Sequence, residues 1–447
     1  MRDFWQFHRF GNKIAIIEED RRDVTYREFD SLICQFSAII QRKSVVAIVC
    51  RNNISTVCAY FACLYNNSIP ILVSDELDGD SVLNIVLRYK SNYIWMPSDR
   101  AEEIKRDYSV VYSNDDYVLC NIQTEKIKFN ENLALLLSTS GTTGNSKFVR
   151  ISKSALMTNT TDICKALDIS SNDIAIAYLK LNYTYGLSVL QTHLYAGGTV
   201  VLTEKNIMSK SFWKLVDRSR VNTFSGVPFC YEIIQCMKID FSKYKNIRKF
   251  TQAGAAMQIE LLRHWSDLCE IKGYQFYVMY GQTEATARMT VLDFDKLNDK
   301  LGSVGKPIGN GRVELSQEGE IIYKGQNVMM GYAHDYRDMY REDDLKGVLR
   351  TGDYGWIDKD GYLFLDSRKS KISKVNGKRL DVKELREMLV LEDEFKVDYQ
   401  VRIESGKLCI CTKEKPDVDL VKHVAKKIQK TVNIPYKLIQ IRQGVYH

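Results

Sequence analysis

LALLLSTSGTTGNSKFVRI, residues 133–151, is the stretch of sequence that decides both the fold and the chemistry. Its first five residues are apolar and predict a buried strand. The loop at 138–147 that follows holds six hydroxyl side chains, two glycines and one lysine. Glycines let a backbone approach an anion closely, hydroxyl and amide groups donate to phosphate oxygens, and a lysine adds positive charge. We interpret it as a phosphate-binding loop; the alternative is a polar hairpin tip.

Two common nucleotide-binding loops do not fit this stretch. A Walker A loop has a glycine directly before its lysine and a helix after it, whereas Ser146 precedes Lys147 and the strand-like FVRI follows. The GxGxxG pattern of a dinucleotide-binding turn is absent as well. The loop therefore indicates a different type of nucleotide site.

Alternating helices and strands surround the loop. Thr25 and Glu28 form a predicted capping box before a helix whose apolar residues recur at helical spacing. Strands that alternate with helices predict mostly parallel sheets covered on both faces, with ligands at the carboxyl ends of the strands. The predicted strands are 45–49, 69–73, 93–96, 174–179, 200–203 and 223–227, and the predicted helices are 55–65, 81–89, 154–167, 187–195 and 211–218.

The sequence changes character after about residue 310. Short strands at 313–315, 320–323, 356–357 and 362–365 predict a small antiparallel β unit. From residue 367 the pattern predicts a small α+β unit with helices at 383–391 and 420–431 and strands at 397–403 and 407–412. We therefore expect an α/β protein with two domains. We expect residues 1–366 to form the large domain and residues 367–447 to form the small C-terminal domain.

Composition excludes several classes of protein. No run of roughly 18 apolar residues exists, so no membrane span is expected. The eleven cysteines lack zinc-ligand spacing, and a reducing cytoplasm is the expected location. From residue 368 onward, 19 Lys and Arg face 11 Asp and Glu, but the two signs alternate. That mixture favours solubility or attraction of a polyanionic small molecule, and we expect no nucleic-acid partner.

Four further motifs follow the loop in order. They are QAGAA at 252–256, YGQTE at 280–284, TGD at 351–353 and DSRKSKISKVNGKRLDVKEL at 366–385. Taken alone, QAGAA, YGQTE and TGD each read as a turn. Together with the loop they resemble the signatures of the adenylate-forming superfamily, which includes acyl-CoA synthetases, adenylation domains and relatives of firefly luciferase. The resemblance extends from about residue 13 to 436, and YGQTEATARM is nearest to bacterial acyl-CoA synthetase-like proteins.

The resemblance implies a role for each motif. Tyr280 stacks on adenine, Thr283 contacts the α-phosphate, Glu284 holds Mg²⁺ and Asp353 accepts hydrogen bonds from the ribose hydroxyls. Carboxylate oxygens suit both of these last tasks. The full set expected to bind ATP or AMP is Thr139, Ser140, Gly141, Thr142, Thr143, Gly144, Lys147, Gly254, Ala255, Ala256, Tyr280, Gly281, Gln282, Thr283, Asp353 and Arg368.

The last motif resembles the junction between the family's two domains, which implies that residues 1–366 are the large ATP- and acyl-binding domain and residues 367–447 are a small mobile lid. It implies a hinge at Ser370 and a thiol-facing loop with Lys374 and Gly377. The family's usual glycine before Arg368 is Ser367 here, and the hinge residue is usually Asp or Lys. A lysine in the family's C-terminal Gly-Lys pair is not found before the chain stops at residue 447. A shortened chain, a group supplied by a partner, and impaired adenylation all stay open.

The acyl pocket is expected at Asn182, Tyr183, Tyr185 and Gly186, which follow a predicted strand. Relatives that activate amino acids carry an Asp there to pair with the substrate ammonium. No acid occurs between Asp173 and Glu204, which argues against an α-amino acid. The aromatic, uncharged segment favours an apolar or aromatic acyl group, although tyrosines are also ordinary core residues.

The implied reaction has two steps. A small-molecule carboxylic acid attacks MgATP, giving an acyl-adenylate and pyrophosphate, and a thiol then displaces AMP. Lys147, Thr283 and Glu284 are expected to act on the reacting phosphates. The acceptor is CoA or a separate phosphopantetheinyl carrier protein. Two alternatives remain, namely a free-standing adenylation enzyme for an unusual acid and a nucleotide-binding protein with impaired adenylation.

Overall fold

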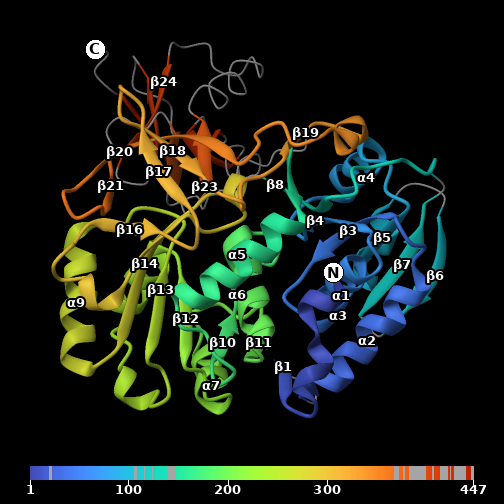
Figure 1. The fold of residues 1–447 in the computed structure, drawn as a ribbon, viewed down its shortest axis with the longest axis horizontal. Helices are drawn as coiled ribbons and strands as arrows, with labels where there is room; N and C mark the ends of the chain where they lie inside the picture. The colour runs from blue at the N-terminus through green and yellow to red at the C-terminus, as the bar shows by residue number, and fades with distance from the viewer. Residues whose placement is uncertain are drawn as a thin grey trace.

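The computed structural model describes residues 1–19, 23–104, 108–114, 116–122, 124–138, 147–366, 372–375, 378–381, 399–404, 407–412, 421–422, 424–426 and 439–443. Two large β-sheets, one of thirteen strands and one of eight, form its body (Figure 1). Predicted residues Thr139, Ser140, Gly141, Thr142, Thr143, Gly144, Arg368, Ser370 and Gly377 lie outside the described residues.

The eight-stranded sheet has a parallel centre and antiparallel edges. β8, β4, β3 and β5 are its parallel strands, and all four are buried, as the apolar runs predict. β8 and β9 pair antiparallel, so the phosphate loop leaves and returns at adjacent strand ends. In sheet order the strands are β19 (Gly331–Ala333), β9 (Phe148–Ser152), β8 (Leu133–Ser138), β4 (Ile69–Ser74), β3 (Val45–Cys50), β5 (Tyr93–Pro97), β7 (Tyr117–Asn121) and β6 (Ser109–Ser113).

The thirteen-stranded sheet is also parallel at its centre. Its β14, β13, β12, β10, β11 and β1 run parallel, and the antiparallel β unit predicted from the short strands extends one side. In sheet order the strands are β17 (Arg312–Leu315), β18 (Glu320–Lys324), β20 (Val348–Ile357), β21 (Leu363–Leu365), β16 (Ser303–Pro307), β15 (Thr290–Leu292), β14 (Gln275–Tyr280), β13 (Lys249–Gln252), β12 (Thr223–Gly226), β10 (Ile174–Ala177), β11 (Thr199–Leu202), β1 (Ile14–Glu18) and β2 (Val24–Thr25).

Helices cover the sheets, and two of them lie between the sheets (Figure 1). α5 contacts β8 and β9, α6 contacts β10 and β11, and the two helices pack together. The Thr25–Glu28 capping box is present at the start of α2. The main helices are α2 (Tyr26–Ile39), α3 (Ile54–Tyr65), α4 (Gly79–Arg88), α5 (Lys153–Ala166), α6 (Thr184–Tyr195), α7 (Lys210–Arg218), α8 (Pro228–Cys236) and α9 (Ile259–Lys272).

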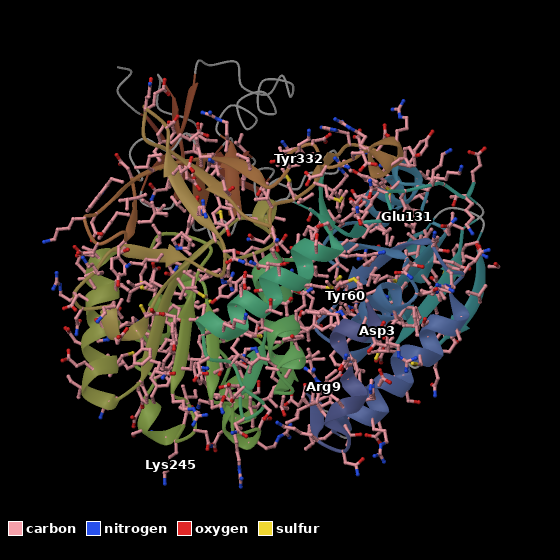
Figure 2. The ribbon with its side chains drawn as sticks, in the orientation of Figure 1. Asp3, Arg9, Tyr60, Glu131, Lys245 and Tyr332 are labelled. Carbon is pink, nitrogen blue, oxygen red and sulfur yellow. The ribbon has the colours of Figure 1, made fainter. Side chains whose placement is uncertain are left out.

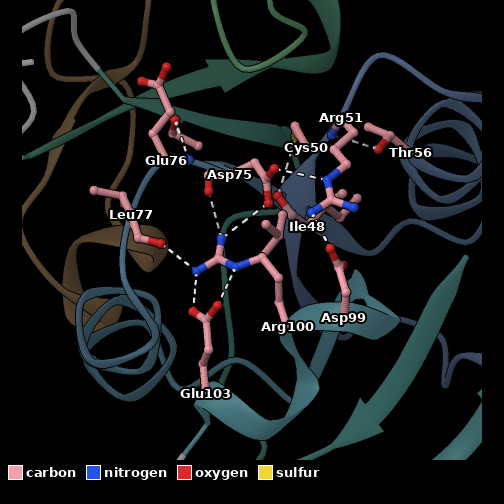
Figure 3. A network of polar contacts seen from close by, with 12 residues as sticks. Ile48, Cys50, Arg51, Thr56, Asp75, Glu76, Leu77, Asp99, Arg100 and Glu103 are labelled. Carbon is pink, nitrogen blue, oxygen red and sulfur yellow. Dashed lines mark hydrogen bonds and ion pairs between the residues drawn. The ribbon is translucent and has the colours of Figure 1, made fainter. Parts of the chain in front are cut away.

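An ion-pair network occupies the carboxyl ends of β3, β4 and β5 (Figure 3). Arg51 donates to Asp75 over 2.9 Å and to Asp99 over 3.0 Å, which joins the residues that follow these strands. Arg100 donates to the Asp75 carbonyl over 2.7 Å and also pairs with Glu103. These contacts tie the residues that follow the three strands to one another.

One strand crosses between the two sheets. The chain leaves β18 in the thirteen-stranded sheet, adds β19 to the edge of the eight-stranded sheet, and returns as β20 beside β18. Residues 325–347, which make this excursion, pass over the top of the molecule in Figure 1. The excursion joins the part of the chain that carries the phosphate loop to the part that carries YGQTE.

The C-terminal residues that are described form two small sheets. β22 (Ile372–Val375) pairs with β23 (Lys378–Asp381), and β24 (Tyr399–Glu404), β25 (Lys407–Thr412) and β26 (Ile439–Gln443) form a three-stranded sheet. The predicted helix at 383–391 lies outside the described residues. The predicted domain boundary at 366/367 stays a prediction. In the described part of the chain, no helix is long and apolar enough to cross a membrane.

His193 makes folding stability depend on pH. It is buried in α6, its Nδ1 lies 2.8 Å from the Val189 carbonyl, and burial lowers its pKa to about 4. The unfolded chain therefore binds a proton near pH 6.5 that the folded protein rejects, so stability falls as pH drops through this window. Between pH 7 and 5 we expect a loss of about 2 kcal/mol from this group.

Urea unfolding of the wild type and His193→Gln at both pH values measures this loss. The glutamine variant lacks the titrating ring, and all other ionisable groups are shared. An equal pH dependence in the two proteins would contradict a neutral buried histidine.

Candidate active site

The predicted adenosine side of the site is assembled from two distant segments. Tyr280 ends β14, and its hydroxyl donates to the Asp353 carboxylate over 2.8 Å. The Gln282 amide donates to the same carboxylate over 2.6 Å and to the Thr351 carbonyl over 3.0 Å. Asp353 lies in β20, a strand of the antiparallel β unit. The pairing of the strands in this unit places the TGD motif beside YGQTE. The structure thus brings Tyr280, Gln282 and Asp353 together.

Gly281 is required by a close backbone approach. A Cβ atom at this position would lie 1.7 Å from the carbonyl oxygen of Ala287. The chain therefore folds back on itself directly after Tyr280, and the short 3₁₀ turn η4 (Thr283–Ala285) follows. This turn presents Thr283 and Glu284 at the end of a parallel strand, where α/β folds bind ligands.

The phosphate side is organised by Tyr332, a residue in β19. The Lys147 ammonium lies 3.8 Å from the centroid of the Tyr332 ring, and the Tyr332 hydroxyl donates to the Glu284 carboxylate over 2.8 Å. Figure 2 shows Tyr332 near the top of the molecule, over the junction of the two sheets. One aromatic side chain thus contacts both the predicted phosphate lysine and the predicted metal ligand.

Arg150 and Asn327 hold the excursion that carries Tyr332. The fully buried Arg150 guanidinium donates to the Met330 carbonyl over 2.8 Å and to the Asp344 carboxylate over 2.6 Å. Gly331 has φ +124°, and a Cβ there would lie 2.8 Å from the same guanidinium. Asn327 donates to the Ala285 carbonyl over 2.9 Å. Tyr332 is therefore fixed relative to the Lys147 strand and to the Glu284 turn.

The predicted acyl residues lie at the start of α6, next to the nucleotide motifs. The Thr184 and Thr283 hydroxyl oxygens are 2.8 Å apart. Gly254 has φ +92°, and a Cβ there would meet the Tyr183 hydroxyl at 2.6 Å. The acyl segment therefore lies against YGQTE and against Gly254, which belongs to the predicted nucleotide-binding residues. The segment predicted to bind the acid and the segments predicted to bind the nucleotide are neighbours.

An arginine lies beside this segment, which the sequence alone describes as uncharged. The Arg288 guanidinium carbon is 4.2 Å from the centroid of the Tyr185 ring, and the side chain is 3% exposed. Burial lowers the pKa of this guanidinium below its ordinary value. A buried positive charge thus lies beside the predicted acyl segment, and the expectation of an apolar or aromatic acyl group stays a prediction.

Sequence reasoning assigned no role to Tyr332 or Arg288. Gly331-Tyr332 reads as part of a glycine-spaced β segment, and nothing in the sequence indicates that it pairs with the strand after Lys147. The sequence did contain an indication for Arg288. It is a single charged residue between the small residues at 285–287 and the apolar run that forms β15. Lys374 lies in β22, where its backbone pairs with Arg379, and its role facing a thiol stays a prediction.

The site can accommodate a magnesium nucleotide. Magnesium uses one or two protein carboxylates and otherwise phosphate oxygens and water. Within the described ranges, no group of three or more His, Cys, Asp and Glu could form a complete metal site. The buried carboxylate of Glu284, whose hydrogen-bond partner Tyr332 also contacts Lys147, fits an ion that arrives bound to phosphates.

Fold and site together define an adenylate-forming enzyme. A family model described as AMP-binding enzyme matches residues 4–333, and the chain belongs to this family. The 2-succinylbenzoate--CoA ligase of Bacillus subtilis (strain 168) is 26% identical over 403 residues, 85% of this chain and 79% of that protein. The predicted family, α/β fold and acid–thiol ligase class are confirmed.

Solved structures share the fold. A double mutant of o-succinylbenzoate CoA synthetase from Bacillus subtilis, bound with a product analogue, has a TM-score of 0.76 at 20% identity and covers 99% of this chain and 95% of its own. The same synthetase with ATP and magnesium ion has a TM-score of 0.68 at 21% identity and covers 99% of this chain and 96% of its own.

Proposed function

We propose that this ligase activates a small carboxylic acid with MgATP and transfers the acyl group to CoA. The observation that carries the proposal is the contact of Tyr332 with both Lys147 and Glu284, because it joins the end of a phosphate loop to a buried carboxylate. The CoA acceptor is supported by the ligases that resemble the chain. Their named acid, 2-succinylbenzoate, is the first substrate to test.

Each residue of the site has a defined task in this proposal. Lys147 steadies the departing pyrophosphate, and Glu284 holds the magnesium ion. Magnesium supplies charge neutralisation at the phosphate oxygens when bound. Thr283 contacts the α-phosphate, which places the attack beside the acyl segment at Thr184. Positioning and charge stabilisation of this kind account for most of the catalysis of phosphoryl and nucleotidyl transfer.

Other parts of the proposal concern the small domain and the compartment. Residues 367–447 would form a lid that turns about Ser370 and presents Lys374 and Gly377 to the thiol. None of the nine cysteines between residues 34 and 269 forms a disulfide, which supports the proposal of a reducing cytoplasm.

Pyrophosphate exchange into ATP, measured with 2-succinylbenzoate and a panel of carboxylic acids, tests adenylation. Consumption of CoA with the best acid tests transfer. Acid-dependent exchange and CoA consumption are expected. Exchange without CoA consumption would indicate a carrier-protein acceptor, and ATP binding with no exchange for any acid would contradict the proposal.

Asp353→Asn is expected to weaken binding of AMP about 10- to 100-fold, because a charged acceptor for the ribose hydroxyls is lost. Calorimetry with AMP measures this change. Inhibition of exchange by tripolyphosphate, which has no ribose, is expected to stay the same. If both ligands weaken equally, Asp353 supports the fold and not the ribose.

A further inference from the structure

Tyr332 reaches the site because of the register in which β19 pairs with β9. Tyr332 lies directly opposite Val149, so the two side chains share one face of the sheet. Lys147 precedes Val149 by two residues, which puts its side chain on that same face and diagonal to Tyr332. The Lys147 ammonium spans this diagonal and lies 3.8 Å from the centroid of the Tyr332 ring. A pairing shifted by one residue would turn Tyr332 away from Lys147.

The hydroxyl end of Tyr332 reaches Glu284. This hydroxyl donates to the buried Glu284 carboxylate over 2.8 Å. A carboxylate has two oxygens and about four acceptor sites, so one oxygen can accept this bond while the other faces a metal ion. The Met329 amide also donates to the Glu284 carbonyl over 2.9 Å. The excursion that carries Tyr332 therefore holds both the backbone and the side chain of Glu284.

The Tyr332 ring is a rigid support for two charged side chains that would otherwise be mobile. It is half-buried and packs against the core under β9. An unrestrained lysine has many rotamers, and binding a phosphate then costs the entropy of ordering its side chain. A lysine that already rests on an aromatic face has lost much of that freedom before the ligand arrives. The contacts of Tyr332 thus preorganise Lys147 and Glu284 together.

We propose that Tyr332 is a positioning residue with two separable tasks. Its hydroxyl orients Glu284 for magnesium, and its ring orients Lys147 for the phosphates of the nucleotide. Hydrogen-bond partners of metal-binding carboxylates fix the ligand in this way and strengthen metal binding. The inference rests on the proposed function, in which Lys147 and Glu284 act on the reacting phosphates.

Tyr332→Phe tests the task of the hydroxyl, because it keeps a ring that can still hold a cation. Calorimetry with ATP, in EDTA and in excess magnesium, gives the factor by which magnesium strengthens ATP binding. This factor is expected to fall about 10-fold in Tyr332→Phe, the lower end of the usual cost of removing such a partner. Binding of tripolyphosphate in EDTA, which involves no metal, is expected to stay the same.

Tyr332→Leu tests the task of the ring, because it removes the ring as well as the hydroxyl. It is expected to show the same smaller effect of magnesium and also to bind tripolyphosphate in EDTA about 3- to 10-fold more weakly, since Lys147 is no longer ordered. Tyr340→Phe is the matched control, because it removes a hydroxyl from a tyrosine of the same excursion that is 64% exposed.

Three results would overturn the proposal. The first is an effect of magnesium on ATP binding that is equal in Tyr332→Phe and Tyr340→Phe. The second is a tripolyphosphate affinity of Tyr332→Leu that equals or exceeds that of the wild type. The third is an equal loss of both affinities in Tyr332→Phe with a lowered midpoint of thermal unfolding, which would assign Tyr332 to the fold.

The role of Tyr332 and the adenylation function can fail separately, because every binding measurement is made without an acid. If the variants bind as expected but no acid supports pyrophosphate exchange, adenylation is contradicted and the role of Tyr332 stands. If acids support exchange, the loss in Tyr332→Phe is expected to be recovered at high magnesium. A loss that magnesium does not recover contradicts the role of the hydroxyl and leaves adenylation intact.

Discussion

Glu284→Gln is expected to lower acid-dependent pyrophosphate exchange about 100- to 1,000-fold, the typical cost of removing one preorganised electrostatic contact. The amide keeps the size of the side chain and can still accept from the Tyr332 hydroxyl, whose oxygen is 2.8 Å from the carboxylate. What is lost is the negative charge that holds magnesium. The magnesium concentration needed for half-maximal exchange should therefore rise as well.

Exchange assays over a range of magnesium concentrations measure both effects. Glu131→Gln is the matched control, because it removes the same charge from an exposed carboxylate away from the site. Exchange by Glu284→Gln at the wild-type rate, with an unchanged magnesium requirement, would refute the metal-ligand role.

Lys147→Ala is expected to reduce exchange by a similar factor, about 100- to 1,000-fold, but with no change in the magnesium requirement. The ammonium now over the Tyr332 ring is 3.8 Å from its centroid, and it would steady the β- and γ-phosphates of the nucleotide. Affinity for tripolyphosphate should fall, and affinity for AMP should fall less, because AMP lacks these phosphates.

Calorimetry with the two ligands, together with exchange assays, separates Lys147 from Glu284. Lys128→Ala removes an exposed lysine and controls for the change in net charge. If Lys147→Ala and Lys128→Ala behave alike, the loop lysine has no part in phosphate binding.

Local structure was predictable because it follows from local patterns. The buried strands at β3, β4 and β5 were expected from short apolar runs, and the Thr25–Glu28 box was expected from two residues. The edge strand β6 and its neighbour β7 were not predicted. All residues of β6 are exposed, the apolar residues Val110, Val111 and Tyr112 included, so it lacks the burial of a core strand. An edge strand is defined by its partner more than by its own side chains.

From the sequence, only the motifs of the site could be predicted, and not the contacts between them. Lys147, Glu284 and Asp353 lie in recognisable strings, but Tyr332 owes its place to the pairing of β19 with β9. Register between strands so far apart in sequence is not encoded in the periodicity of either one. Arg288 was likewise hidden, because its burial against Tyr185 depends on the packing of segments that are far apart in the sequence.

The excursion through β19 also determines when the site can form during synthesis of the chain. Arg150 and Met330, which it joins, are 180 residues apart. Contacts of such long range form late, because the entropy of closing the intervening chain must be overcome first. A nascent chain emerging from the ribosome therefore carries the phosphate loop long before it can bring Lys147 and Glu284 together. The contact of Tyr332 with Lys147 and Glu284 is therefore one that the polypeptide gains only after residue 332 has been made.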